Sequence, residues 1–217
     1  MTLTNQQLLT SDLHPTISPE RLGTYLLASN RDDSRALKLY IWNAHVGEAF
    51  HLPIQATEVA LRNTINGALV RRFGADWWNN AKFLAVASAR QRKDITDVTR
   101  RIQKRGSTLC TGQIVANLSF GFWAGMLDSS YNISIWSREL SSAFPHLPNK
   151  KKRKQVATRV RKVNNFRNRI WHHEPIFRMN LSQEYADAME LLGWICPTKL
   201  GWVKPHCRVP ALLRQKP

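Results

Sequence analysis

Apolar residues recur at intervals of three and four along most of this 217-residue sequence, whereas stretches of alternating apolar and polar residues are hard to find. Intervals of three and four put side chains on one face of an α-helix, and a half-buried β-strand would need a period of two. The pattern therefore predicts an all-α fold. The length suits one core, so we expect a single domain over residues 1–217, with residues 1–17 and 203–217 as peripheral extensions.

Capping residues and apolar periods locate the individual helices. Ser18-Pro19-Glu20 favours a helix start, because it combines a hydroxyl N-cap, a proline at the first helical position and an acid in the first turn. We expect a first helix over residues 19–28, a second from residue 33 to an end near Pro53, and a third over residues 59–69, closed by Gly74. Further helices are expected over residues 88–105 and 112–127. Another should follow the basic run at residues 150–154, and a last one should span residues 182–194. Residues 196–217 should form a short basic, partly ordered tail.

The charge balance indicates the kind of partner. The sequence has 32 Lys and Arg residues against 15 Asp and Glu, which gives a formal net charge of +17. Such an excess attracts polyanions, so RNA, DNA or an acidic membrane surface is the expected partner, and an acidic protein would also fit. Charge alone favours nucleic acid but does not choose among these partners. The basic helix over residues 88–105 is either a solvated face or a phosphate-contacting surface. The candidate RNA-binding residues are Arg100, Arg101, Lys104, Lys151, Lys152 and Arg153.

Three widely spaced cysteines indicate a reducing compartment, because small secreted domains carry dense, even sets. Residues 2–7 lack the features of a signal peptide and no run of about 18 apolar residues occurs, so we expect a cytoplasmic protein that does not enter the membrane. A zinc site at Cys196, His206 and Cys207 would lack close cysteine spacing and a fourth ligand. We therefore expect neither a metal nor another cofactor.

A break in an apolar stripe marks the segment expected to carry chemistry. Val156, Val160, Val163 and Ile170 fall at spacings of four, three and seven, which is typical of a buried helix face. The position four residues after Val163 is Arg167, where the pattern calls for an apolar residue. An arginine there needs an anion, a partner chain or a solvated cleft, because an unpaired charge is costly to bury. Function is expected where such a local rule is broken.

His172 lies five residues after Arg167, about 140° around an ideal helix, so the two side chains would not share a face of a straight helix. Pro175 disfavours helical geometry at the residue before it. The helix should therefore end near His172 or His173, where a fraying turn can bring imidazole and guanidinium together. Asn168 lies four residues before His172 and is placed to hydrogen-bond its ring. We expect one cluster of Arg167, Asn168 and His172.

These three residue types suit cleavage of an RNA phosphodiester. An imidazole can accept the proton of a ribose 2′-hydroxyl or donate one to the leaving oxygen, while a guanidinium holds phosphate oxygens. Internal attack by the 2′-oxygen would leave a 2′,3′-cyclic phosphate and a 5′-hydroxyl without a metal. The other interpretation of His172 is a helix-terminal residue that caps carbonyl groups.

The segment RNRIWHHEPIF, residues 167–177, resembles the RNxxxHHEPI signature of Abi-like proteins. These proteins belong to the HEPN superfamily, which is defined by an arginine, four to six residues and a histidine. Further segments resemble the family in the same order, so that the resemblance covers most of the chain. They are ALKLYIWNA (36–44), EVALRNTI (58–65), FGADWW (73–78), LSFGFWAGM (118–126) and ELLGWI (190–195).

The resemblance implies a HEPN-like helical bundle with additional N-terminal helices, commonly a homodimer whose two signature segments face each other across the interface. It also implies metal-independent endoribonuclease activity, in bacterial abortive infection against phage or as the toxin of a toxin-antitoxin pair. By position, Arg167 is the phosphate-binding arginine, Asn168 the polar residue after it and His172 the catalytic histidine. The supporting residues are His173, which is structural or a second proton carrier, and Glu58, Arg62 and Asn63, which match a second motif of the family. Some HEPN proteins do not cleave, and the alternative is therefore a non-catalytic module that holds RNA or an acidic antitoxin.

Overall fold

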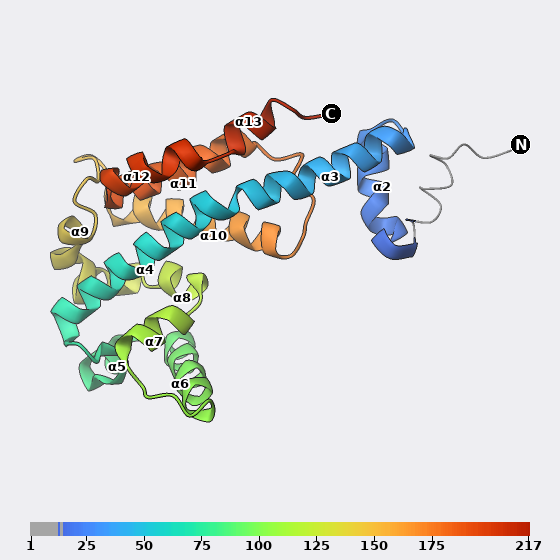
Figure 1. Ribbon diagram of the computed structural model, residues 1–217. Coiled ribbons are helices and arrows are strands. Elements are labelled where there is room, and N and C mark those ends of the chain that lie inside the picture. Colours follow the sequence, from blue (N-terminus) through green and yellow to red (C-terminus); the bar gives the residue numbers. More distant parts are fainter. Residues whose placement is uncertain (1–12, 14) are drawn as a thin grey trace, which may run out of the picture.

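The computed structural model describes residue 13 and residues 15–217, and this part of the chain consists of helices joined by short connections, without a strand (Figure 1). The predicted all-α fold is confirmed. The extension expected over residues 1–17 lies largely outside the described residues. The helices are α2 (Pro19–Ala28), α3 (Asp33–Ala49), α4 (His51–Phe73), α5 (Ala81–Val86), α6 (Ala89–Lys104), α7 (Thr111–Asn117), α8 (Phe120–Gly125), α9 (Ser137–Ala143), α10 (Arg153–Trp171), α11 (Leu181–Ile195), α12 (Pro197–Val203) and α13 (Val209–Leu213), with short 3-10 or π turns η1 (Trp77–Asn79), η2 (Ser129–Tyr131), η3 (Asn132–Trp136) and η4 (Lys204–His206).

Helices α3 and α4 follow each other almost in line and form a long rod through the molecule (Figure 1). Helix α11 packs against α4, and α10 packs against α11. Two large apolar clusters fill the interior. The first contains Trp77, Trp123 and Trp136 and joins α4 to α6, α7, α8 and the first half of α10, while the second contains Tyr25 and Trp42 and joins α2, α3, α13 and the last turns of α10. Helix α10 therefore contributes side chains to both clusters.

The apolar residues of α10 explain how one helix reaches both clusters. Val156, Val160 and Val163 are buried in the first cluster, Phe166 is buried in the second, and Ile170 packs beside it partly exposed. Steps of three and four residues keep these side chains on one face along the whole helix. The predicted stripe is confirmed, and Phe166 extends it.

Two predicted helix boundaries are wrong. A helix end was expected near Pro53, but α3 ends at Ala49 and α4 begins at His51, well before the expected start at Val59. Pro53 lies in the first turn of α4. The N–H groups of a first turn have no partner within the helix, so a residue without an N–H is tolerated there.

The apolar stretch over residues 112–127 is two short helices, where one central helix was expected. Helix α7 ends at Asn117, Leu118 is extended, and Ser119 caps α8. The Ser119 hydroxyl accepts a hydrogen bond from the N–H of Phe122 at 3.2 Å. A serine side chain competes for backbone N–H groups in this way, which favours the start of a new helix over continuation of the old one.

The segment expected to be a basic, partly ordered tail is instead helical and packed. Val209, at the start of α13, is fully buried in the second cluster. The indole N–H of Trp42 donates to the carbonyl of Leu212 at 2.9 Å, and Arg208 pairs with Glu48 at 2.6 Å. Helix α13 therefore packs against α3 and α11, and the expectation of a partly ordered tail is wrong for this segment.

Candidate active site

Helix α10 ends in a turn that fixes the backbone of the two signature histidines. His172 is the C-cap residue, and His173 has a φ of 54°, in the left-handed region. The N–H of His173 donates to the carbonyl of Ile170 at 2.9 Å, and the N–H of Glu174 donates to the carbonyl of Arg169, also at 2.9 Å. This pair of bonds is the Schellman arrangement, which closes a helix through one left-handed residue. The predicted end of the helix near His172 or His173 is confirmed.

The charged side chains beside this turn hold it in place from both sides. Arg169 Nε and Glu174 Oε2 form an ion pair of 2.9 Å. Arg21 of α2 donates from Nη1 to the carbonyl of His173 at 2.6 Å. Helix α2 therefore contacts the signature segment directly.

Arg167 lies one turn before the end of α10 and contacts three other side chains. Its Nε lies 3.7 Å from Glu58 Oε2 on α4, and its Nη1 donates to Asn168 Oδ1 at 3.4 Å. Its guanidinium carbon lies 4.7 Å from the centre of the Trp171 ring. The Arg167 side chain is 28% exposed, so it is partly desolvated and still open to a ligand. An arginine stacked on an indole and held by a carboxylate is restricted in orientation, which favours recognition of a planar or tetrahedral anion.

Glu58 is shared by two guanidinium groups. Burial raises the pKa of the Glu58 carboxyl above its ordinary value, while the charges of Arg167 and Arg62 act in the opposite direction. The Nε atoms of Arg62 and Arg167 are buried without a hydrogen-bond partner among the described residues. Two cations around one carboxylate leave a local excess of positive charge, which favours the binding of an anion.

His172 is exposed and has no recorded side-chain contact with this cluster in the described part of the chain. Its backbone N–H donates to the carbonyl of Asn168 at 2.9 Å, but no hydrogen bond or ion pair of its ring is found in the described part of the chain. The expected hydrogen bond between the Asn168 amide and this ring is not found among the described residues, and the Asn168 side-chain oxygen accepts from Arg167. Asn63 is exposed on α4 and makes no side-chain bond to these groups. The structure brings Arg167, Asn168, Glu58 and Arg62 together and leaves His172 and Asn63 outside.

Trp171 and His51 belong to this region and were missed in the sequence. Their rings stack with centroids 5.6 Å apart and an angle of 21° between the planes, and Trp171 is 40% exposed. The spacing of four residues between Arg167 and Trp171 could have indicated that they share a helix face. No local pattern relates His51 to α10, because the contact joins distant segments.

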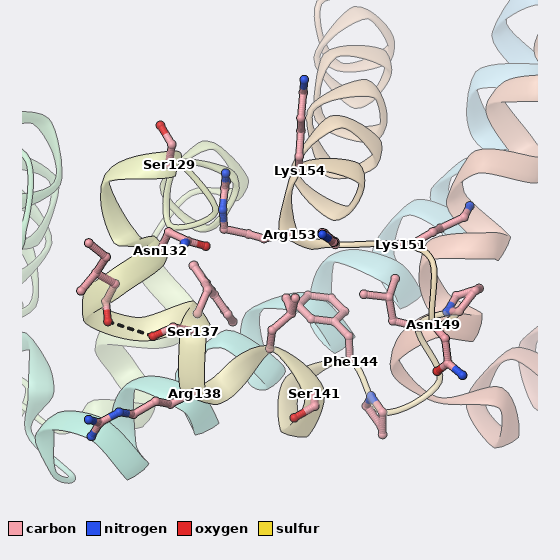
Figure 2. A pocket seen from close by; sticks show the side chains of 17 residues that line it. Ser129, Asn132, Ser137, Arg138, Ser141, Phe144, Asn149, Lys151, Arg153 and Lys154 are labelled. Atoms are coloured by element: carbon pink, nitrogen blue, oxygen red, sulfur yellow. Dashed lines mark hydrogen bonds between the residues drawn. The ribbon is translucent and has the colours of Figure 1, made fainter.

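The basic residues near the start of α10 have structural partners. Lys151 pairs with Glu190 at 2.8 Å and lies over the ring of Trp194, and Arg153 donates to the carbonyl of Leu127. Figure 2 shows Lys151 and Arg153 in a cavity of about 840 Å³ between α9 and the start of α10. Neither Arg167 nor His172 lines this cavity. Lys152 lines it too, at the N-cap of α10.

Helix α6 is the exposed basic helix that the sequence predicts, and its left-handed Gly106 follows the end of the helix. Charged side chains on the polar face of α6 form ion pairs and hydrogen bonds with one another. Asp97 lies 3.7 Å from Arg100 and also pairs with Lys93, while Arg101 donates to the carbonyl of Asp97 at 3.3 Å. Lys104 is exposed. These surface pairs contribute little stability and leave most of the positive charge available to a polyanion.

Comparisons with protein-family models, with curated proteins and with solved structures find no match for this chain. Among residues 13 and 15–217, no helix has the length and apolar character needed to cross a membrane. That part of the chain also holds no group of three or more His, Cys, Asp or Glu side chains arranged to bind a metal ion. The assignment of function therefore depends on the geometry and chemistry of the site itself.

Proposed function

We propose that this protein is a metal-independent endoribonuclease of the Abi-like HEPN type that acts on RNA in the bacterial cytoplasm. In the proposed reaction a ribose 2′-oxygen attacks the adjacent phosphorus and the bond from phosphorus to the 5′-oxygen breaks. The 2′-hydroxyl proton passes to a base, and the departing oxygen takes up a proton. The products are a 2′,3′-cyclic phosphate and a 5′-hydroxyl.

The observation that carries this proposal is the pair of guanidinium groups around the half-buried Glu58. The positive charge of Arg167 and Arg62 exceeds the single negative charge of Glu58, and the Arg167 side chain is 28% exposed, so a scissile phosphate could accept hydrogen bonds from its guanidinium. Charge accumulates on the phosphate oxygens as the 2′-oxygen attacks. Cations stabilise that charge most when they need not move during the reaction. The orientation of the Arg167 guanidinium is already restricted by its contacts with Trp171 and Glu58.

His172 is the proposed proton carrier. Its ring projects from the C-cap of α10, two residues before Glu174 and one turn beyond Asn168, and it is free of internal partners among the described residues. A proton carrier must be accessible to the reacting oxygens, and an exposed ring at a rigid helix end satisfies that requirement. In the proposed homodimer, two such helix ends meet, so that the imidazole of one chain serves the phosphate held by the other.

The test is cleavage of end-labelled RNA by purified protein in the presence of EDTA. We expect cyclic phosphate ends from the wild type, and losses of roughly a hundredfold or more for Arg167→Ala and His172→Ala. Arg161→Ala removes the same charge from an exposed position of the same helix, and His206→Ala removes an exposed imidazole elsewhere; both should cleave at close to the wild-type rate. Full cleavage by well-folded Arg167→Ala and His172→Ala proteins would refute the proposal.

The second candidate function is a non-catalytic module that binds RNA or an acidic antitoxin through its net charge of +17. Such a protein would bind RNA in a salt-dependent way and leave it intact. The same labelled RNA separates the two candidates, since only the first produces new ends. A physiological role in defence against phage, or as a toxin, belongs to the first candidate.

A further inference from the structure

A second concave region lies beside the Arg167 cluster and is not used by the proposed reaction. This cavity of about 700 Å³ is bounded by α2, α3, the first residue of α4 and the end of α10. It is separate from the hollow in Figure 2, which lies at the other end of α10. The signature segment therefore contributes to two neighbouring features, the cationic cluster and this cavity.

Aromatic rings form much of the cavity wall. Tyr25 and Tyr40 contact each other edge to face with their ring centres 5.2 Å apart. The rings of His51, on α4, and Trp171, on α10, lie nearly parallel to each other. Tyr25 is buried and Tyr40 is half-buried, whereas His51 and Trp171 are exposed. Exposed rings that are already packed against neighbours offer aromatic surface to a nucleobase at a low entropic cost.

One polar group of the cavity, the side chain of Asn43, is held in a fixed orientation. Asn43 Oδ1 accepts hydrogen bonds from the N–H groups of Ile176 at 2.8 Å and Phe177 at 3.1 Å, which leaves the amide nitrogen as its remaining donor. Burial raises the pKa of Tyr25 to about 12, so its hydroxyl stays protonated near neutral pH. A small number of oriented polar groups among aromatic rings is typical of a site for a planar, hydrogen-bonding ligand.

Trp171 joins the cavity to the phosphate-binding cluster. Its ring stacks on His51 at the cavity and also lies under the guanidinium of Arg167. A nucleotide carries a base and a phosphate as neighbours, and this indole places a base-binding surface next to a phosphate-binding group. We propose that the cavity binds the nucleobase adjacent to the phosphate held by Arg167, and so selects where RNA is cut. This inference rests on the proposed function.

Binding can be tested without cleavage. Each of the four nucleoside 5′-monophosphates is titrated into the full chain, and the indole N–H signal of Trp171 is followed by NMR, with Trp171→Phe used to assign it. We expect at least one nucleotide to move this signal in a saturable way and further than inorganic phosphate does, because phosphate alone can occupy Arg167 beside the ring but not the cavity. Absence of a response to all four nucleotides would overturn the proposal.

A matched pair of variants then tests whether the cavity is the binding site. Ala44 is exposed on α3 and lines the cavity, so Ala44→Trp fills the space without removing a contact. His45→Trp adds the same ring one residue further along, where the side chain faces a different hollow. We expect Ala44→Trp to reduce the response of Trp171 to nucleotide to the response seen with inorganic phosphate alone, and His45→Trp to retain the full response. His51→Ala, which removes an exposed ring, provides the same test if Ala44→Trp does not fold.

RNA cleavage by the same variants separates failure of this inference from failure of the proposed function. We expect Ala44→Trp to cut RNA more slowly and to lose the preference for particular sites, while His45→Trp cuts as the wild type does. If RNA is cut and neither nucleotide binding nor site preference depends on the cavity, this inference fails and the proposed function stands. If nucleotide binds in the cavity and no RNA is cut, the endoribonuclease proposal fails and the base site stands.

Discussion

Glu58 is a residue whose charge disfavours folding, because burial raises the pKa of its carboxyl by more than Arg167 and Arg62 lower it. Below its ordinary pKa the carboxyl is protonated in both the folded and the unfolded protein, and it has no effect on stability. Above its raised pKa it is ionised in both, and the folded state bears the larger desolvation cost. The ionised group is therefore retained at some expense of stability, which is common at functional sites.

The variant Glu58→Gln tests this reasoning. We expect its free energy of unfolding to exceed that of the wild type near pH 7. This difference should shrink as the pH falls through the raised pKa of Glu58 in the folded protein, and it should vanish below the ordinary pKa of the carboxyl in the unfolded chain. RNA cleavage should fall by roughly tenfold or more, because Arg167 loses the anion that orients it. Urea unfolding at several pH values and cleavage assays measure the two effects. If Glu58→Gln is less stable than the wild type at pH 7, the conclusion that the ionised Glu58 carboxylate destabilises the folded state is contradicted.

His173 occupies a left-handed position, where a residue with a Cβ is strained. We expect His173→Gly to raise the free energy of unfolding by about 0.5–1 kcal/mol, since relief of this strain outweighs the extra flexibility of glycine in the unfolded chain. His173→Ala, which loses the ring and keeps the Cβ, should show no such gain. Urea unfolding of both variants provides the comparison.

The same pair separates the two roles considered for the His173 ring. If the ring is structural, both variants cleave RNA at the wild-type rate. If it is a second proton carrier, both lose cleavage although the glycine variant is more stable. A glycine variant no more stable than the alanine variant would refute the Schellman description of this helix end.

Among the elements, α13 was the least expected, and its packing can be tested at one buried residue. Val209 is fully buried against α3, so Val209→Ala leaves a cavity and should lower the free energy of unfolding by about 2 kcal/mol. Gln215→Ala, at an exposed position after the same helix, should leave stability unchanged. Thermal or urea unfolding would measure both. An unaffected Val209→Ala protein would mean that this segment is a loose tail after all.

The elements also differ in how far the sequence could predict them. Helices α6 and α11 were predictable because a cap, a continuous apolar stripe and a clear end agree; Ser88 and Gly106 bound α6, for example. The break between α7 and α8 was not predicted, because Leu118 continues the apolar pattern and a single serine such as Ser119, which caps α8, is also found within helices. The helices at 197–213 are short and their burial comes from α3 and α11, so their sequence carries little local signal.

At the scale of the whole molecule, the site combines features that the sequence could and could not predict. The position of Arg167 on a buried stripe and the helix end beside it follow from rules that act within one helix. The contact of Arg167 with Glu58 joins α10 to α4, and only the family resemblance suggested it. The stack of His51 on Trp171 had no counterpart in the sequence at all. Residues from distant elements meet through tertiary packing, which periodicity does not describe.

The separation of His172 from Arg167 in one chain leads to a prediction about the assembly. In the proposed homodimer each site takes Arg167 from one protomer and His172 from the other. A dimer of one Arg167→Ala chain and one His172→Ala chain would then have one site with both residues lost and one site with both intact. After equal mixing and subunit exchange, half of the dimers are mixed, so about a quarter of the wild-type sites should return.

Cleavage by the mixture measures this recovery against each inactive variant alone. Mixing Arg167→Ala with a chain that carries both substitutions supplies the control, because no combination of those two chains restores an intact site. If the two residues act within one chain, neither mixture recovers activity, and the imidazole must then reach Arg167 by a rearrangement of the helix end closed at His173. Recovery near a quarter in the first mixture alone would locate the two catalytic side chains on opposite subunits, and it would make dimerisation a condition for cleavage.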